Sequence, residues 1–510
     1  MQPNKQANNI IVINLKMLKK IRVAIAILFF VGVTFLFLDF TGSLHSWLGW
    51  MAKIQFLPAV LALNFVVILS LIAITLIFGR IYCSVVCPAG VFQDIISHIG
   101  GKFKKNRFTY SPEHKILRLI VLAIFVLLMV FGLNSIAILI APYSAYGRIV
   151  SNIFQPVYQW FNNIFANIAE HYESYAFYQT DVWLKSIPVF VVSLITLIVF
   201  CVLAWKNGRT WCNNICPVGT VLGYLSKFSY YKINIDKDKC VGCSLCTKNC
   251  KASAIDYKNY SVDHSRCVDC FNCIGKCKKH AISFSHKTEQ TQASNSNTET
   301  NDNGRRKFLS IVSLFAATSV VKAQQKKVDG GLAVIEDKKI PERFFPIKPA
   351  GSHSLKNFSE HCTACQLCVA ECPNGVLRPS NNLSTLMQPE MSFERGYCRP
   401  ECTRCSQVCP TGAITEITIE QKSSIHVGHA VWIKDNCLPL IDGVSCGNCA
   451  RHCPTGAITM INQSQSNPNS PKIPMIDTER CIGCGACENL CPARPFSAIY
   501  VEGNKVHSEF

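Results

Sequence analysis

The sequence predicts a multi-domain fold class, in which an α-helical polytopic membrane domain is joined to small α+β domains built around clusters of cysteine. Three observations predict it. Four long apolar runs lie in the first 210 of the 510 residues. Twenty-four of the 29 cysteines fall into six groups of four. A pair of adjacent arginines followed by another apolar run stands past the middle of the chain.

The four apolar runs are candidate transmembrane helices, because a span needs about 20 mostly apolar residues. They cover residues 22–40, 56–78, 119–141 and 187–205. Basic residues precede the first run, fill the loop between the second and third, and follow the fourth, whereas the 142–186 connection has few. Both ends of this unit are therefore expected in the cytoplasm, and 142–186 outside it. The aromatic residues of that connection suit an interfacial anchor or a docking segment.

One motif occurs twice, at residues 79–90 after the second apolar run and at 208–219 after the fourth. Each copy contains Cys-x3-Cys-Pro, and a single further cysteine, Cys201, stands alone in an apolar run. Two copies could bring four thiols together as a metal or cluster site, or serve as a redox relay. A structural role, shaping the turn before each proline, stays open. The four thiols are Cys83, Cys87, Cys212 and Cys216.

A double Cys-x2-Cys-x2-Cys-x3-Cys pattern follows the fourth apolar run. This spacing is specific for [4Fe–4S] clusters, in which three close thiolates hold one cluster and the fourth reaches its partner. We therefore expect Cys277 to complete the first cluster and Cys250 the second. Zinc is disfavoured, because zinc sites usually pair two distant Cys-x2-Cys arms. Lys251 and Lys278 stand where a proline is usual. The quartets are Cys240, Cys243, Cys246 and Cys250, then Cys267, Cys270, Cys273 and Cys277.

The middle of the chain changes character twice. Residues 286–303 are polar and are predicted to form a flexible linker. Residues 304–323 begin Gly-Arg-Arg-Lys-Phe-Leu and continue apolar, which is typical of a twin-arginine export signal; a buried helix with a basic start is the alternative. The run 308–321 is short for a span but is a candidate fifth one. Since basic residues precede it, residues 324–510 are expected outside the cytoplasm.

Four more cysteine quartets lie in this last part, each followed by proline, and predict four further [4Fe–4S] clusters. Their spacing does not show which quartet lends its fourth thiolate to which cluster. Cluster binding is coupled to folding, so a chain that carries clusters must cross a membrane folded, as an arginine signal permits. The quartets are Cys362, Cys365, Cys368 and Cys372; Cys398, Cys402, Cys405 and Cys409; Cys437, Cys446, Cys449 and Cys453; and Cys481, Cys484, Cys487 and Cys491.

The formal charge of +19 is weak evidence for a nucleic-acid partner, because six clusters of about −2 each offset much of it. No Cys-x2-Cys is followed by His, which disfavours a c-type haem. The sequence divides into a membrane domain, a cytoplasmic two-cluster ferredoxin, a linker, the arginine signal and an exported four-cluster ferredoxin. Their ranges are 1–230, 231–285, 286–303, 304–323 and 324–510.

Two resemblances follow from these motifs. Residues 15–285 resemble NapH, the polytopic quinol-dehydrogenase subunit of periplasmic nitrate reductase systems, in their four spans, two Cys-x3-Cys-Pro motifs and two cluster quartets. Residues 304–500 resemble the NapG/MauM ferredoxins, in the arginine signal, four quartets and the Cys-x8-Cys-x2-Cys-x3-Cys variant at Cys437. The chain departs from both by fusing units that are usually separate.

The resemblance implies a multi-pass protein of the bacterial inner membrane, with its first ferredoxin cytoplasmic and its second periplasmic. It would act as a quinol dehydrogenase-type electron-transfer component, oxidising menaquinol from the membrane pool and passing electrons through six [4Fe–4S] clusters to a periplasmic cytochrome or reductase, such as nitrate reductase. The alternative is an assembly, maturation or sensor protein for another metalloenzyme of oxidase, nitrous oxide reductase or dehalogenase type.

No residue declares itself as the quinone site, and no catalytic residue is assigned. Asp39 and His45 are expected near the outer face and His98 near the inner one, each as an interface residue rather than a proton acceptor. The terminal acceptor, the direction of electron flow, the oligomeric state and cleavage of the signal stay open.

Overall fold

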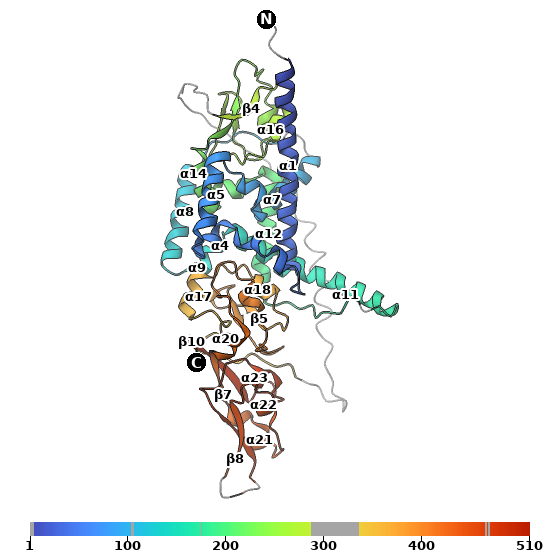
Figure 1. The fold of residues 1–510 in the computed structure, drawn as a ribbon, viewed down its shortest axis with the longest axis vertical. Coiled ribbons are helices and arrows are strands. Elements are labelled where there is room, and N and C mark those ends of the chain that lie inside the picture. The colour runs from blue at the N-terminus through green and yellow to red at the C-terminus, as the bar shows by residue number, and fades with distance from the viewer. Residues whose placement is uncertain are drawn as a thin grey trace, which may run out of the picture.

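The computed structural model describes residues 5–103, 107–174, 176–286, 336–464, 467 and 470–509. The arginine signal and nearly all of the expected linker lie outside the described residues. The molecule is elongated, with a helical bundle in the middle (Figure 1). The first cysteine-rich module lies at the end nearer the N-terminus, and the second lies at the opposite end.

The bundle is built from helices that correspond to the four apolar runs. These are α1 (Lys5–Leu38), α5 (Phe65–Phe78), α8 (Lys115–Val130) and α12 (Ile187–Asn207). Two stretches, Met17–Leu38 and Ile187–Asn207, are long and apolar enough to cross a membrane. By themselves they are weak evidence of a membrane association, since length and composition are all they satisfy.

The second and third apolar runs are shorter helices than the sequence predicts. A turn separates α4 (Phe56–Leu61) from α5, with Leu63 at φ 51° and the side chain of Asn64 accepting from the Val67 N–H at 3.3 Å. Helix α8 ends before Gly132, at φ 74°. Because turns interrupt both runs, α5 has 14 residues and α8 has 16, against about 20 for an average span.

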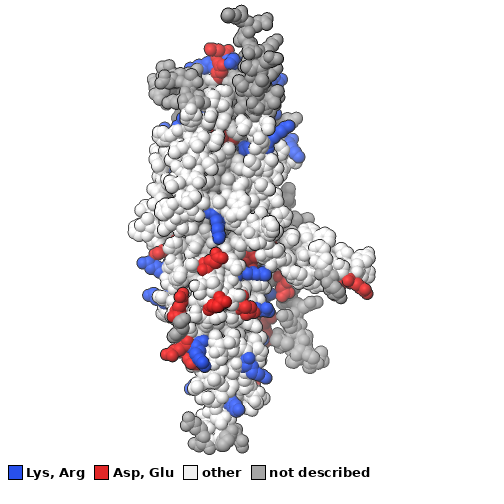
Figure 2. Space-filling view, in the orientation of Figure 1, with Lys and Arg blue, Asp and Glu red and all other residues white. Residues whose placement is uncertain are grey.

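The outer surface of the bundle is apolar. Leu28, Val66 and Ile116 are more than half exposed although each is a large aliphatic residue. Figure 2 shows charged side chains gathered toward the two ends of the molecule and sparse over the bundle on this face. A continuous exposed apolar surface marks an interface with a membrane or another protein.

The 142–186 connection is largely helical. It contains α10 (Pro142–Ile149), η1 (Val150–Phe154) and α11 (Gln155–His171). Helix α11 projects sideways from the bundle near its junction with the second module (Figure 1), and its Trp160, Phe161 and Phe165 side chains are about half exposed. An apolar face on a helix in this position is typical of a segment lying along a membrane interface.

Short helices connect the bundle and carry the repeated motif. They are α2 (His45–Leu48), α3 (Trp50–Lys53), α6 (Tyr82–Val85), α7 (Pro88–Phe103), α9 (Asn134–Ala137), α13 (Thr210–Asn214) and α14 (Pro217–Ser226). In each repeat a short helix carries the first cysteine, and a longer helix starts at the proline after the second.

The first module is two small halves around a cysteine-lined interior. Strand β1 (Tyr231–Ile235) pairs antiparallel with β4 (Ile282–His286), and β2 (Ile255–Asp256) with β3 (Ser261–Val262). Its helices are α15 (Leu245–Lys248) and α16 (Asn272–Lys276).

The second module is also built from short antiparallel strand pairs and short helices. Its antiparallel pairs are β5 (Leu377–Pro379) with β6 (Pro389–Met391), β7 (Ile425–Trp432) with β10 (Ile499–Glu509), and β8 (Ile458–Asn462) with β9 (Lys472–Ile476). Its helices are α17 (Leu355–His361), α18 (Leu367–Ala370), α19 (Arg404–Gln407), α20 (Ile419–Ser424), α21 (Leu438–Ile441), α22 (Asn448–Arg451) and α23 (Ala486–Leu490), with 3-10 turns η2 (Leu383–Thr385) and η3 (Lys434–Asn436).

Candidate iron–sulfur sites and the four-thiol cluster

Four of the six quartets share one loop conformation. In each Cys-x2-Cys-x2-Cys loop, the residues immediately before and after the middle cysteine are left-handed, with φ between 45° and 79°. Successive backbone turns of this kind point N–H groups inward and form concavities that bind anions, including iron–sulfur groups. The paired positions are Gly242 and Ser244, Asp269 and Phe271, Ala364 and Gln366, and Gly483 and Gly485.

Backbone amides also point at cysteine sulfurs. The Ala281 N–H donates to Cys277 Sγ at 3.3 Å, Ala364 to Cys362 at 3.4 Å, and Ala498 to Cys491 at 3.3 Å. Hydrogen bonds to the sulfurs are a means by which proteins tune iron–sulfur clusters. All 29 cysteines are free of disulfides, so the donor set fits thiolate ligands of [4Fe–4S] clusters.

Within the described ranges, no three His, Cys, Asp or Glu side chains are grouped as the ligands of one metal ion.

In the first module, Cys250 lies among the thiols of the other quartet. Burial is the main reason that the pKa of Cys250, Cys267 and Cys273 is raised. The Cys250 thiol raises the pKa of Cys267 and Cys273 further, and the Cys270 thiol raises that of Cys250. Charges influence one another this way only at short range inside a protein. Cys250 is therefore placed to complete the Cys267 set, as the spacing predicts.

The second module shows an exchange that its spacing does not reveal. The Cys409 thiol adds to the rise in pKa of Cys362, Cys365 and Cys368, which burial mainly causes. The Cys372 thiol does the same to the pKa of Cys398 and Cys405. Cys409 is thus placed near the first quartet and Cys372 near the second, as an exchange of fourth cysteines between two clusters would require.

The third and fourth quartets do the same. The Cys491 thiol adds to the rise in pKa of Cys437 and Cys449, and the Cys453 thiol adds to that of Cys481 and Cys484. The two pairs of sites touch, since the Cys398 N–H donates to the Cys484 carbonyl at 2.9 Å.

The second module docks on α9 and α10 of the bundle through the segment around its first quartet. Asn134 Nδ2 donates to the carbonyls of Ser359 and Glu360, both at 2.8 Å. A Cβ added at Gly147 would lie 2.6 Å from the Cys365 carbonyl oxygen, so only glycine allows this approach of helix α10. The cluster loop is therefore seated directly on the bundle.

Trp183 fixes the other side of this junction. The Arg378 and Arg395 guanidiniums lie 4.4 and 4.6 Å from its ring. A cavity of about 730 Å³ lies beside it, lined by the 142–186 connection and by the second module, including Cys372. Lys185 and Gln155 line this cavity and bond to each other at 3.1 Å; burial lowers the pKa of Lys185 to about 8, although Cys372 opposes the shift.

The first module docks on the opposite end through the two repeated motifs. The Arg80 side chain donates to the Ser265 carbonyl at 2.8 Å, and the Arg209 N–H to the Lys251 carbonyl at 2.8 Å. Lys251 is buried and pairs with Asp94 of α7, which also binds Arg209 at 2.7 Å. Each repeat therefore contacts one half of the module.

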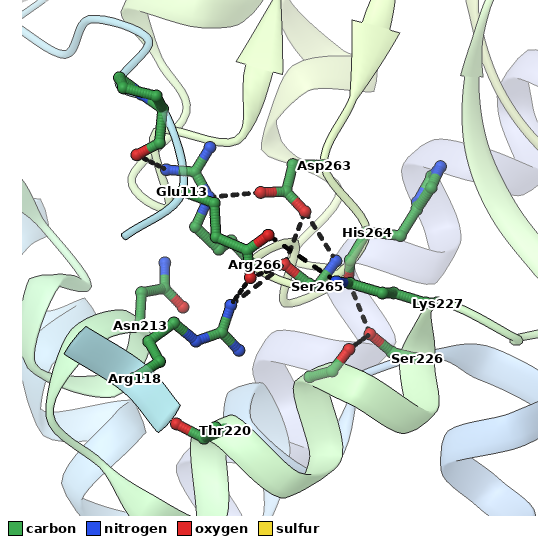
Figure 3. Close-up of polar contacts among 12 residues, drawn as sticks. Glu113, Arg118, Asn213, Thr220, Ser226, Lys227, Asp263, His264, Ser265 and Arg266 are labelled. Atoms are coloured by element: carbon green, nitrogen blue, oxygen red, sulfur yellow. Dashed lines mark hydrogen bonds and ion pairs between the residues drawn. The ribbon is translucent and has the colours of Figure 1, made fainter. Parts of the chain in front are cut away.

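A second polar network reinforces this docking (Figure 3). Arg118, at the start of α8, pairs with Glu113 at 2.5 Å and donates to Ser265 Oγ at 3.1 Å. The Ser226 hydroxyl of α14 donates to the His264 carbonyl at 2.6 Å. The segment immediately before Cys267 is thus held by two helices.

The four thiols of the repeated motif converge between these docking surfaces. Burial raises the pKa of Cys87, Cys212 and Cys216, and neighbouring thiols of the set raise it further. All four side chains are only 3–4% exposed. The topology thus brings together the two copies that the sequence showed as separate.

The remaining sequence candidates have local roles. Asp39 accepts from the N–H groups of Thr41 and Leu44, both at 2.8 Å, and so closes a turn. His45 is half-buried, and burial lowers its pKa. His98 is exposed on α7. Sequence reasoning noted Lys251 as a departure from the usual proline but missed its ion pair with Asp94.

Comparisons with known proteins agree with this geometry. A family described as a 4Fe-4S binding domain matches residues 60–106, 189–235 and 405–425, so it covers both repeated motifs. A family described as a 4Fe-4S dicluster domain matches residues 358–413 and 444–494, which contain the cysteines of all four quartets of the second module except Cys437. No solved structure is significantly similar to the chain.

Several relatives are ferredoxin-type proteins. The ferredoxin-type protein NapG of Escherichia coli is 27% identical over 201 residues, 37% of this chain and 81% of NapG. The methylamine utilization ferredoxin-type protein MauM of Methylobacillus flagellatus is 27% identical over 149 residues, 28% of this chain. The alignment spans 63% of MauM, less than two thirds of its length. The ferredoxin-type protein NapF of Escherichia coli is 28% identical over 160 residues, 31% of this chain and 87% of NapF. This chain is accordingly a ferredoxin-type iron–sulfur protein of electron transfer.

Proposed function

We propose that this iron–sulfur protein sits in the inner membrane, oxidises menaquinol and passes the electrons through six [4Fe–4S] clusters to a periplasmic cytochrome or reductase. The observation that carries the proposal is the seating of two ferredoxin modules at opposite ends of one apolar helical bundle (Figure 1). A bundle about as long as the hydrocarbon core is thick would place one module on each side of the membrane.

The order of sites in the second module supports outward transfer. The Cys365 loop lies against α10, and its partner site contains Cys372 and Cys398. The bond from Cys398 to Cys484 then leads to the distal pair of sites. Electrons that enter at the junction can leave at the far end of the module, where a soluble partner has access.

The junction cavity is our candidate site for the quinol headgroup. It lies beside Cys372, at the level where α11 leaves the bundle, and Lys185 and Gln155 offer polar atoms to a quinol hydroxyl. A quinol releases two electrons and two protons, and each [4Fe–4S] cluster carries one electron at a time. Two sites that exchange Cys372 and Cys409 would accept the pair in succession.

The topology and export route are part of the proposal. Residues 231–285 are cytoplasmic, residues 324–510 are periplasmic, and residues 304–323 carry the arginine signal between them. The relatives named NapG and MauM are described as ferredoxin-type proteins, so the proposed fusion with a NapH-like membrane part rests on the repeated motif and on the docking described above.

The test is menaquinol-dependent reduction of the clusters in full-length protein reconstituted in lipid. Anaerobic addition of a menaquinol analogue should reduce clusters of the second module, followed by electron paramagnetic resonance. Lys185→Met should slow this reduction, whereas the exposed-surface control Lys356→Met should not. Chemical reduction by dithionite should be equal in all three proteins. Clusters that dithionite reduces but menaquinol does not would exclude quinol oxidation and leave the iron–sulfur assignment intact.

A further inference from the structure

The two Cys-x3-Cys-Pro motifs contact each other reciprocally, in a near two-fold arrangement. Arg209 of the second copy donates to the Cys83 carbonyl of the first at 2.5 Å. Arg80 of the first copy donates to the Cys212 carbonyl of the second at 3.3 Å. The four thiols lie between the two copies of the motif, and each copy supplies two of them.

The surroundings of the four thiols carry an excess of positive groups. Arg80 is fully buried and, within the described part of the chain, forms no ion pair with a carboxylate, although the buried Asp269 lies close enough to interact with it electrostatically. Arg209 is also fully buried and shares Asp94 with two other cations, Arg22 and Lys251. Buried charge is costly unless it is compensated, so this interior favours an anionic group.

Donors point at the sulfurs themselves. Gln93 Nε2 lies 3.2 Å from Cys212 Sγ, Arg80 Nη2 lies 3.8 Å from Cys83 Sγ, and the Gly219 N–H lies 3.3 Å from Cys216 Sγ. Helices α7 and α14 also begin immediately after the second cysteine of each copy, which directs the positive ends of two helix dipoles at the set. Arg80 Nε and Arg209 Nη2 are buried without a partner in the described structure.

We propose that Cys83, Cys87, Cys212 and Cys216 together bind a further iron–sulfur cluster, a seventh redox centre placed between the two ferredoxin modules. An anionic cluster held by four thiolates would compensate the buried positive charge and accept the hydrogen bonds that point at the sulfurs. Neither copy of the motif alone has enough cysteines to hold the cluster.

The place of this centre gives it a redox task. Tyr82 is adjacent to the four thiols and is influenced by Cys83, Cys87 and Cys216. Tyr143 is buried, and both Tyr82 and Cys365 act on it electrostatically. Tyr82 and Tyr143 therefore lie near both the four-thiol centre and the first site of the second module.

The same centre also reaches the first module. Arg80 contacts Cys83 Sγ and acts on Asp269, which accepts from Cys267 Sγ at 3.6 Å. The centre would take one electron from a reduced cluster on one side, which is thereby oxidised, and give one electron to an oxidised cluster on the other. No bond is formed and no proton moves in this step.

The inference does not rest on quinol oxidation, and its first test reads composition rather than activity. Full-length protein purified anaerobically should contain two or four iron atoms, with matching sulfide, beyond the about 24 expected for six [4Fe–4S] clusters. Cys212→Ser should lose that increment and keep the ferredoxin-type resonance signals. Cys201→Ser is the matched control, since Cys201 is a half-buried cysteine of α12 outside the set, and it should keep all iron.

The result that overturns the proposal is an iron content that is equal in wild type, Cys201→Ser and Cys212→Ser. Zinc at the four thiols, or a disulfide between them in the purified protein, would overturn it as well. If Cys212→Ser does not fold, Cys87→Ser measured the same way decides the point from the other copy of the motif.

A second test measures electron transfer between the two modules through the four-thiol centre, which we call the relay. In right-side-out vesicles, dithionite that is kept outside should reduce the clusters of the second module and then those of the first. In Cys212→Ser the second module should be reduced normally while the first stays oxidised, and Cys201→Ser should behave as wild type. Equal reduction of the first module in all three proteins would overturn the relay.

Discussion

Lys251 forms a buried ion pair with Asp94, and thereby ties the residue that follows a cluster ligand to the helix that follows a Cys-x3-Cys-Pro motif. A proline usually follows the fourth cysteine of such a quartet. Here the position needs a side chain that can reach α7, and its carbonyl receives the Arg209 N–H. The sequence departure at Lys251 is thus a docking contact.

Asp94→Asn should detach the first module from the bundle. The change keeps the shape of the side chain but leaves Lys251, Arg209 and Arg22 without their shared carboxylate. Loss of one partner of a buried pair typically costs about 3–5 kcal/mol. The thermal midpoint, followed at the clusters of the first module, should fall. Asp238→Asn, at an exposed position, should leave it unchanged; an equal midpoint in both variants would contradict the docking role.

The same contact should make the docking acid-sensitive. Although burial alone would raise the pKa of Asp94, Arg209 and Lys251 hold it well below its ordinary value. A carboxyl whose folded pKa is depressed stabilises the fold above its unfolded pKa of about 3.9, and this stability is lost as the pH falls toward the folded value. The unfolding free energy, measured between about pH 6 and about pH 3, should decline more in wild type than in Asp94→Asn.

The exchange of fourth cysteines predicts which cluster a substitution removes. Cys372→Ser should disturb the cluster held by Cys398, Cys402 and Cys405, although Cys372 belongs to the first quartet by sequence. Cys409→Ser should disturb the cluster at Cys362, Cys365 and Cys368. The resonance spectrum of Cys372→Ser should match that of Cys398→Ser, and the spectrum of Cys409→Ser should match that of Cys365→Ser. Matching within each sequence quartet instead would exclude the exchange.

Trp183 should hold the second module on the bundle. Trp183→Ala removes the ring that lies between Arg378 and Arg395, and cation–π contacts of this kind are worth roughly 0.5–2 kcal/mol each. Transfer between the modules should slow, while the iron content stays at the wild-type level. Tyr172→Ala is the control, because Tyr172 is exposed on the same connection. Unchanged transfer in Trp183→Ala would show that the junction does not depend on this ring.

Topology can be tested through the arginine pair. Protease added to right-side-out spheroplasts should digest residues 362–491 and spare residues 240–277. Changing Arg305 and Arg306 together to Lys should leave the second module protected, because the export signal would no longer be recognised. Protection of the wild-type second module, while an external control protein is cut, would place both modules in the cytoplasm and exclude delivery to a periplasmic partner.

Features that are local in the chain could be predicted from the sequence. Three cysteines of a Cys-x2-Cys-x2-Cys loop lie within one turn of backbone, so their spacing alone predicts a cluster site. The apolar runs likewise predict helices at α1 and α12. The sequence did not reveal the interruptions of the second and third runs, because Leu63 at positive φ and the chain reversal at Gly132 depend on how the neighbouring segments pack.

The sequence by itself determined the six quartets, the duplicated thiol motif and the arginine pair, since each is a pattern of near neighbours. Only the tertiary structure decided which residues distant in the chain meet. It paired Cys409 with Cys362, and Cys491 with Cys437, and it joined the two thiol motifs around one interior. Such meetings depend on the packing of whole helices and modules, and residue spacing carries no record of which surfaces will bury one another.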